Sequence, residues 1–421
     1  MYFTFITFLQ FLTNKVIHYV LYFILFFMIL FFIYVKLKYQ FWTLQPVFHF
    51  YDFNYYIKNT GIINTELPKK NKYTNFNNLH FYNSNTLTKN QWKNIVAFIQ
   101  INYLQNKNKI KGIHNVYYPT LNNINNYFKG HNYPSYWSLY YVEDYLSDIK
   151  NDCIIKNNKL IGCMSSRPLL CCIINKNDNI IFDLYYVDYL CVDKNHRKSG
   201  IAQQIIQTHE YNQSHSNKKI CVSLFKREEE LTFIVPVTCF DTYCYKMSNF
   251  TYIDDVFLDT NIKMLTCDKQ NIYYFYHYIE ETKAKWNIYI IPSISNLYAL
   301  IKSKNIFIKM FIISGEKEIV SAFIFKKTCT YLEKGKEVLS CIGSINSDYL
   351  SPQEFVDCFK LAVYSLLNEN FHYLSIENLS DNKIINNWNF NFDEIFKSKT
   401  AYFFYNFAHS PFKSEKCLII N

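Results

Sequence analysis

The stretch LCVDKNHRKSGIAQQIIQTHE, residues 190–210, decides the fold class of this chain. Its start continues a run of β-branched and aromatic residues, which predicts a strand. A basic loop with one glycine follows, and a helix is predicted from Ile201 to about Ser214. The first N–H groups of such a helix have no partner within it and carry the positive end of its dipole. Strand, basic loop and helix in this order therefore predict an anion site suited to phosphate.

The side chains of this loop fit the same chemistry. Arg197 offers a planar fork of donors and Lys198 a point charge. Gly200 lets the backbone approach a ligand closely. The chain has only 8 glycines, so we expect each of them to meet a requirement of the backbone. The loop lacks the GxxxxGK[ST] pattern of a nucleotide-binding P-loop and the GxGxxG pattern of a dinucleotide site. An ordinary basic strand-to-helix turn is the simpler alternative.

The composition and net charge limit the classes of binding partner that this chain is expected to have. The net charge is +10, which fits nucleic acid, a membrane surface, an anionic cofactor or a general lysine bias. No recognised nucleic-acid motif occurs, so we expect a phosphate-bearing cofactor and no nucleic acid. The 13 cysteines form no CxxC pair or zinc-ligand spacing, which predicts free thiols in a reducing compartment and no metal site.

Residues 16–35, VIHYVLYFILFFMILFFIYV, predict a single N-terminal membrane anchor. At 1.5 Å per residue, such a segment spans roughly 30 Å of hydrocarbon. A buried core helix would show one polar face, and a cleaved signal peptide would have a shorter apolar run and a small-residue cleavage site. The free thiols and an intracellular cofactor favour a body that faces the cytosol.

The rest of the chain alternates predicted strands and helices. A capping box at Thr88 and Gln91 opens a helix to about Leu104, and a second helix begins with Ser351-Pro352 and runs to about Leu367. Helices are also expected at 271–285 and 293–303, and a short helix with a turn at 239–250. The expected strands are 160–165, 169–174, 180–192, 219–225, 306–313, 318–327, 337–344, 372–376, 400–407 and the end of the chain, with a hairpin turn at 176–179. This order predicts a mixed α/β fold in two similar halves.

Several segments resemble a known family. The loop 197–202 resembles the pyrophosphate loop of the GNAT acyltransferases. KYQFWTLQPV at 38–47 and YLCVDKNHRKSGIA at 189–202 resemble the N-myristoyltransferases, GNAT relatives with two fused GNAT-like halves. Further similar segments follow in the family's order: KLIGCMSSRP at 159–168, PVTCFDTYCYKMSN at 236–249, YLSIENLSDNK at 373–383, AYFFYNF at 401–407 and SEKCLIIN at 414–421. The apolar segment places the anchor at 1–37, and the resemblance implies an acyl-CoA half at 38–262 and a substrate half at 263–421.

The resemblance also implies site residues. The backbone N–H groups of Tyr189 and Leu190 would form an oxyanion hole for the thioester carbonyl. The α-carboxylate of Asn421, the last residue, would be the base that removes a proton from the attacking amine. The residues implied in acyl-CoA binding are Tyr39, Gln40, Phe41, Trp42, Tyr189, Leu190, Cys191, Val192, Arg197, Lys198, Ser199, Gly200, Ile201 and Ala202.

The chain departs from the family at several points. Tyr189 replaces a phenylalanine, Gly200 replaces the second basic residue of the loop, and the end is one residue shorter when counted from Lys416. FNFDEIFKS, residues 390–398, stands in place of a glycine-rich segment near the peptide site, which leaves recognition of an N-terminal glycine open.

The function implied by the resemblance is an N-acyltransferase, and the apolar segment 16–35 adds the membrane anchor. Its co-substrate would be myristoyl-CoA, and its acceptor a peptide or protein N-terminus. An acetyl-CoA-dependent N-acetyltransferase is the alternative, which the glycine at position 200 favours. An anchored CoA-binding protein without activity is a third interpretation.

Overall fold

The computed structural model describes residues 2–104, 115–148, 153–175, 178–228, 233–250, 261–315, 318–333, 335–388 and 393–421. The chain divides into two compact units, Met1–Val47 and Phe48–Asn421. The first unit contains α1 (Tyr2–Lys38) and a short turn at Trp42–Leu44. Within α1, the segment Lys15–Lys38 has a mean hydropathy of 2.7, and it is the one helix of the described residues long and apolar enough to cross a membrane. Its length and composition agree with the predicted anchor.

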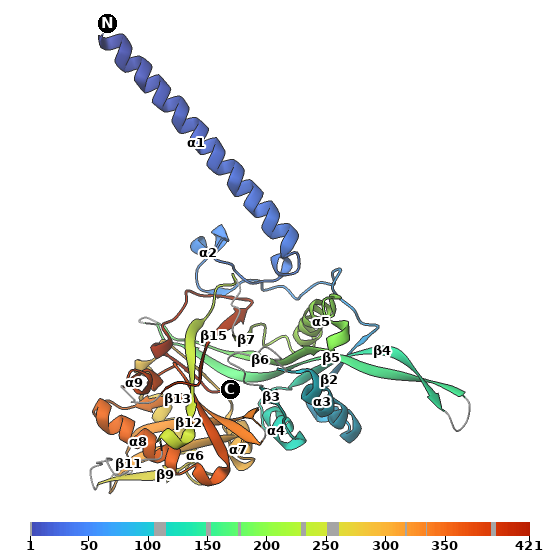
Figure 1. Ribbon diagram of the computed structural model, residues 1–421, viewed down its shortest axis with the longest axis vertical. Coiled ribbons are helices and arrows are strands. Elements are labelled where there is room, and N and C mark those ends of the chain that lie inside the picture. The colour runs from blue at the N-terminus through green and yellow to red at the C-terminus, as the bar shows by residue number, and fades with distance from the viewer. Residues whose placement is uncertain are drawn as a thin grey trace. The chain divides into compact units, whose positions relative to one another are not determined.

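The second unit is built on one large mixed sheet covered by short helices (Figure 1). The helices are α2 (Phe53–Ile57), α3 (Lys89–Asn102), α4 (Leu121–Asn125), α5 (Ile201–Ser216), α6 (Ile272–Glu281), α7 (Ile294–Lys302), α8 (Pro352–Tyr364) and α9 (Asn382–Asn386). The strands are β1 (Gly61–Ile62), β2 (Leu79–Asn83), β3 (Val116–Tyr117), β4 (Tyr136–Asp148), β5 (Cys153–Ile173), β6 (Ile180–Val192), β7 (Ser223–Glu228), β8 (Thr238–Lys246), β9 (Ile262–Thr266), β10 (Ile288–Ile291), β11 (Ile306–Ile313), β12 (Ile319–Glu333), β13 (Lys336–Asn346), β14 (Phe371–Glu377), β15 (Phe396–Tyr405), β16 (Phe407–Ala408) and β17 (Cys417–Ile419).

The sheet order explains how distant segments meet. Fifteen strands form one sheet, whose main path is β17-β10-β5-β6-β7-β15-β8-β14-β13-β12-β11-β9. β4 and β5 extend from it as a long two-stranded ribbon (Figure 1). The chain therefore has the mixed α/β architecture that was predicted. Strands from both ends of the sequence alternate in the path, and the predicted duplication into two halves stays a prediction.

Most of the predicted elements are confirmed. The capping boxes at Thr88 and Ser351 open α3 and α8, with both reciprocal hydrogen bonds present in each. The chain end forms the buried strand β17. The predicted turn at 176–179 lies partly outside the described residues, but Ile173 pairs with Ile180 in antiparallel register, as a hairpin requires.

Two predictions about local structure are wrong. Residues 239–250 do not form a short helix: β8 covers most of them and pairs with β14 and β15, and a 3-10 turn ends the segment. This segment is rich in aromatic residues and lies between the neighbouring strands β14 and β15, and both features favour a strand. The two strands predicted at 160–165 and 169–174 are one strand, β5. Pro168 is tolerated because it lies between the last pair with β4, at Ser166, and the first pair with β10, at Leu170.

Candidate functional site

A β-bulge interrupts the pairing of β5 with β6 near the end of β6. Cys163 pairs with Cys191 and Ser165 pairs with Asp188, so Tyr189 and Leu190 together face one residue of β5. Tyr189 has a φ of +55°, an uncommon value for a residue with a side chain. A bulge leaves its extra residue outside the ladder. It therefore turns the backbone at the two residues from which an oxyanion hole is predicted.

Aromatic packing holds this bulge in place. The Tyr189 ring stacks on Trp137 with the centroids 5.6 Å apart, and its hydroxyl lies 3.2 Å from that of Tyr117. Burial is the main cause that raises the pKa of the Tyr189 hydroxyl well above its usual value. The side chain is therefore a neutral core group. Any chemistry at this position belongs to the backbone.

The Tyr189 N–H already has an internal acceptor. It donates to Oδ1 of Asp188 over 2.7 Å, and the same oxygen accepts the Tyr103 hydroxyl over 2.8 Å. Leu190 is 37% exposed, so the outer part of the bulge is open to solvent. A thioester oxygen at Tyr189 would therefore have to replace the Asp188 carboxylate as the acceptor.

The loop after β6 ends in a helix start that is open to an anion. Gly200 is the N-cap of α5 and adopts the left-handed conformation with φ +80°. As a glycine, Gly200 provides no side-chain cap for the first N–H groups of the helix. Lys198 also has a positive φ, +66°, and Ile201 and Ala202 form the first turn of α5.

Arg197 braces the loop instead of pointing freely outward. Its Nε donates to the Val192 carbonyl over 3.2 Å, and its Nη2 donates to the Asn102 carbonyl over 3.1 Å. The guanidinium thus joins the end of β6 to the end of α3. Ser199 Oγ donates to the His196 carbonyl over 2.6 Å. These three bonds shape the loop, and a phosphate contact by the Arg197 or Ser199 side chain stays a prediction.

Four of the residues implied in acyl-CoA binding lie in the first unit. Trp42 and Phe41 form an edge-to-face pair with centroids 5.2 Å apart, and the Thr43 hydroxyl donates to the Gln40 carbonyl over 3.0 Å. Tyr39 follows directly on α1, and its N–H donates to the Val35 carbonyl. The segment 39–42 is thus a compact aromatic turn, and its role stays a prediction.

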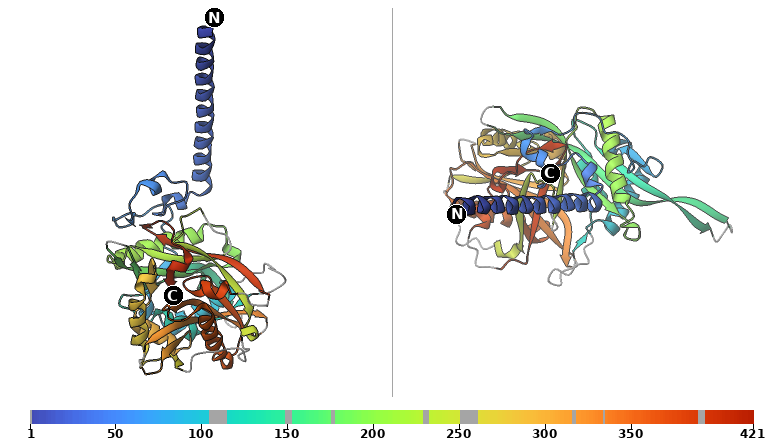
Figure 2. Two further views of the ribbon diagram at one scale, coloured as in Figure 1. Left: turned by 90° about the vertical axis from the view of Figure 1, so that its left-hand side faces the viewer. Right: turned by 90° about the horizontal axis from the view of Figure 1, so that it is seen from above.

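The C-terminus is buried in the sheet. β17 pairs in parallel with β10, and the Ile420 N–H donates to the Ile290 carbonyl over 2.8 Å. Asn421 is 3% exposed, and the C mark lies within the outline of the body in every view (Figure 2). The Asn421 amide donates to the Tyr402 hydroxyl over 2.9 Å and accepts from Lys326 Nζ over 3.1 Å. The last residue is therefore fixed by side chains of β12 and β15.

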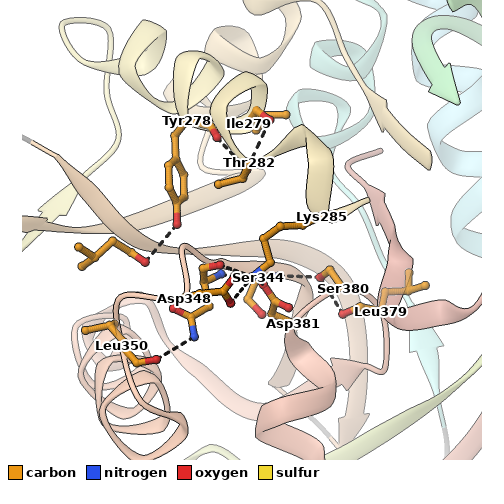
Figure 3. A network of polar contacts seen from close by, with 12 residues as sticks. Tyr278, Ile279, Thr282, Lys285, Ser344, Asp348, Leu350, Leu379, Ser380 and Asp381 are labelled. Atoms are coloured by element: carbon orange, nitrogen blue, oxygen red, sulfur yellow. Dashed lines mark hydrogen bonds and ion pairs between the residues drawn. The ribbon is translucent and has the colours of Figure 1, made fainter. Parts of the chain in front are cut away.

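A polar network holds the segment that leads into β17 (Figure 3). Lys285 forms ion pairs with Asp348 over 2.9 Å and Asp381 over 3.3 Å, and it also donates to the Asn346 carbonyl. The hydroxyl of Ser380 accepts the Ser344 N–H, and the Ser380 N–H donates to the Ser414 carbonyl. Bonds that cross between these distant segments leave the chain end little freedom to fray.

Sequence reasoning missed a group of buried and half-buried charges beside the chain end. They are Arg167 on β5, Asp188 on β6, Lys226 on β7, Lys326 on β12 and Glu377 on β14. Lys226 and Glu377 form an ion pair over 2.7 Å. The available signal was a lone charge within an apolar strand, as in SAFIFKK around Lys326, because such a charge is costly unless a partner meets it.

Lys326 has an environment that disfavours its charge. Burial is the largest cause that lowers its pKa to about 8, the neighbouring Arg167 lowers it further, and Asp188 opposes the shift. Lys226 differs: although burial lowers its pKa, Glu377 raises it above the usual value. Within this cluster, Lys226 is paired with Glu377, whereas Lys326 forms no ion pair with a carboxylate of the described residues.

The position of Tyr127, whose ring contacts Arg167 and Lys326, depends on close packing of the segment 126–130 against α7. Asn296 on α7 donates to the carbonyls of Asn126, Tyr127 and Lys129. Gly130 has a φ of +71°, and a Cβ there would lie 2.8 Å from the Ser295 carbonyl carbon and oxygen. The segment can approach α7 because this position has no side chain.

We expect Gly130→Ala to destabilise the protein by about 2 kcal/mol or more, because backbone strain and overpacking add. Urea unfolding followed by tryptophan fluorescence measures this. Gly335→Ala is the matched control: its φ is +77°, but nothing lies within 4 Å of the added Cβ, so strain alone acts. Equal losses in both variants would contradict the role of the contact with α7.

Within the described residues, no group of three or more His, Cys, Asp or Glu side chains could hold a metal ion. Twelve cysteines are free in the same part of the chain. Cys163 and Cys191 face each other in the strand pair next to the bulge, with their sulfur atoms 3.5 Å apart. Burial raises the pKa of Cys163 well above its usual value, so this thiol is protonated.

The chain matches no family model and no curated protein sequence. Its structure is similar to that of Saccharomyces cerevisiae N-myristoyltransferase with bound myristoyl-CoA, with a TM-score of 0.64 and 12% identity over 89% of this chain and 94% of that one. The yeast enzyme with bound myristoyl-CoA and inhibitors gives a TM-score of 0.65 and 13% identity over 89% and 91%. This chain therefore has the fold of that enzyme along nearly its whole length.

Proposed function

We propose, from the N-myristoyltransferase fold of this chain, that it is an acyltransferase that moves an acyl group from acyl-CoA to a primary amine. The observation that carries the proposal is the bulge at Tyr189 and Leu190 in the same sheet as the buried residue Asn421. Acyl transfer needs a donor pair for the thioester oxygen and a base for the amine. The two features supply these groups from main-chain atoms.

The co-substrate is an acyl-CoA, and myristoyl-CoA is the form we propose. The diphosphate binds at the start of α5, where the left-handed Gly200 presents uncapped N–H groups. The thioester carbonyl lies at the bulge, with the Tyr189 N–H released from Asp188. β6 pairs with β7 only at residues 185–187, so the bulge lies beyond the end of that ladder. The loop 197–202 completes the part of the site that lies in the second unit, and acyl-CoA contacts by residues 39–42 stay a prediction from the resemblance alone.

In the reaction, the neutral amine attacks the thioester carbon, the C–N bond forms and the C–S bond to CoA breaks. The α-carboxylate of Asn421 takes the proton from the amine, and CoA leaves as the thiol after it gains a proton. The acceptor is a peptide or protein N-terminus. At an α-amino pKa of about 7.7–8.0, most of this group is protonated at neutral pH, so a base raises the reactive fraction. No step requires a covalent intermediate on a cysteine.

We further propose that residues 16–35 anchor the enzyme in a membrane, with the catalytic body facing the cytosol. The apolar span Lys15–Lys38 supports the anchor. An anchored transferase is close to the lipid phase in which long acyl chains partition.

A thermal-shift series with acetyl-CoA, octanoyl-CoA, myristoyl-CoA and free CoA tests the proposal. We expect myristoyl-CoA to raise the melting temperature most, because burial of each methylene contributes about 0.8 kcal/mol. A shift that is largest with acetyl-CoA would favour the acetyltransferase, whose acyl pocket is short, and equal shifts by all four ligands would favour a CoA-binding protein that does not recognise the acyl group. If none of the four raises the melting temperature, the chain does not bind acyl-CoA and the proposal fails.

A further inference from the structure

Arg167 is a buried guanidinium that forms no ion pair with any carboxylate in the part of the chain that the structure describes. It is 2% exposed, and its Cζ lies 4.5 Å from the ring centroid of Tyr127 and 5.0 Å from that of Tyr186. Its Nη1 is buried and has no hydrogen-bond partner. Aromatic stacking engages the face of a guanidinium, whereas an anion binds its in-plane N–H groups. The contacts of Arg167 therefore leave the anion-binding edge of the group unused.

A second cation lies beside the same ring. Lys326 Nζ is 5.3 Å from the Tyr127 ring centroid and donates to the side-chain oxygen of Asn421. The Tyr127 hydroxyl is also buried without a hydrogen-bond partner. Among the described residues, Arg167 and Lys326 form no ion pair with a carboxylate, whereas Lys226, in the same cluster, pairs with Glu377. Three unused or weakly used donors thus converge at one ring.

Arg167 and Lys326 disfavour each other's charge, because burial removes hydration and the two cations repel, and Asp188 offsets this only in part. The pKa of Lys326, which burial and Arg167 lower to about 8, reflects this conflict. Such a cluster is most stable when a ligand brings a negative charge. A carboxylate fits best, because the fork of Arg167 can hold both of its oxygens.

The cluster lies next to the proposed reaction centre. Arg167 pairs in register with Tyr186, three residues before the bulge at Tyr189, and Lys326 contacts the last residue of the chain. A carboxylate bound here would therefore be close to the amine that Asn421 is proposed to deprotonate.

We propose that Arg167 and Lys326 bind a carboxylate of the acyl acceptor, so that the enzyme selects amines with an acidic group nearby. This inference rests on the proposed function and names its acceptor class. The carboxylate comes either from an acidic side chain within the first three residues of a protein or from the α-carboxylate of a free amino acid. Both sources present the same planar anion to Arg167.

Peptide binding to the full-length protein tests the proposal without relying on turnover. The protein is loaded with a non-hydrolysable thioether analogue of myristoyl-CoA. Calorimetry then gives Kd for amidated peptides that begin with Gly, Ala or Ser and carry Asp at the second or third position, and for matched Asn peptides. A second arm compares glycine with glycinamide. In one of the two arms, we expect the acidic ligand to bind at least about tenfold more tightly than its neutral counterpart. The neutral ligand lacks the negative charge that would pair with the buried cation.

Arg167→Met removes the charge while keeping a similar volume. We expect the preference for the acidic ligand to fall to less than about threefold and the affinity for the thioether analogue to stay unchanged. The ligand-free variant should melt at a higher temperature than the wild type, because an unpaired buried cation has been removed. Lys226→Met, the matched change at a paired cation, should melt lower because it leaves Glu377 unpaired.

Equal Kd values within both ligand pairs in the wild type would overturn the inference, as would an unchanged preference in Arg167→Met. A loss of analogue affinity in Arg167→Met would also overturn it, because the cation would then serve CoA. Failure of the wild type to bind the analogue at all would instead refute the proposed function.

Discussion

Truncation after Ile419 abolishes acyl transfer and leaves acyl-CoA binding intact. The deletion removes the buried residue Asn421, whose side-chain amide contacts Lys326 and Tyr402, and with it the proposed carboxylate base. Loss of a positioned general base lowers the rate by about 10²–10⁴-fold. Release of free CoA measured against acceptor concentration gives kcat/KM, and a thermal shift with myristoyl-CoA checks the folded state. The shift should stay close to that of the wild type.

Two control variants separate the carboxylate from the Asn421 side chain. Asn421→Ala keeps the chain length and the terminal carboxylate, so we expect its activity to stay within about tenfold of the wild type. One glycine added after Asn421 keeps the side chain but moves the carboxylate by about 3.5 Å, and its activity should be as low as that of the truncated chain. Full activity of the extended chain would show that another group is the base.

Gly200→Glu weakens acyl-CoA binding by about tenfold or more. The substitution places a carboxylate at the start of α5, where it repels the diphosphate and occupies the positive end of the helix dipole. It also strains a backbone position with φ +80°. We expect the weakening to be larger at low ionic strength, because salt screens the repulsion. Isothermal titration with myristoyl-CoA at two salt concentrations measures both effects.

Gly200→Asn is the matched control for the strain. Asparagine tolerates the left-handed region and carries no charge, so this variant should bind acyl-CoA within about threefold of the wild type. The Glu variant should also keep its ligand-free stability, because an acidic side chain at a helix start is favourable and offsets the strain. Equal acyl-CoA affinity in the Glu and Asn variants would place the diphosphate elsewhere.

Local patterns in the sequence predicted much of the secondary structure. The capping boxes at Thr88 and Ser351 depend on residues three apart, and both are present in the structure. The β6–loop–α5 unit also runs without interruption from Ile180 to Ser216, so its order could be read directly. Predictions failed where a neighbouring strand decides the outcome, as in β8, which lies between β14 and β15.

The candidate site divides in the same way. The strand, the loop and the apolar chain end were predicted as separate pieces. The positive φ of Tyr189, the use of Arg197 as a brace and the unpaired Arg167 were not. Each of these depends on contacts between segments that lie far apart in the chain.

The sequence by itself determined the α/β class, the apolar N-terminal helix, the α5 loop and the buried chain end, because short-range periodicity and capping carry that information. Only the tertiary structure decided that Arg167 and Lys326 meet at the Tyr127 ring and that Lys326 contacts Asn421. The physical reason is that charge pairing and burial are properties of neighbours in space: β5, β12 and the chain end come together only through the order of strands in the sheet.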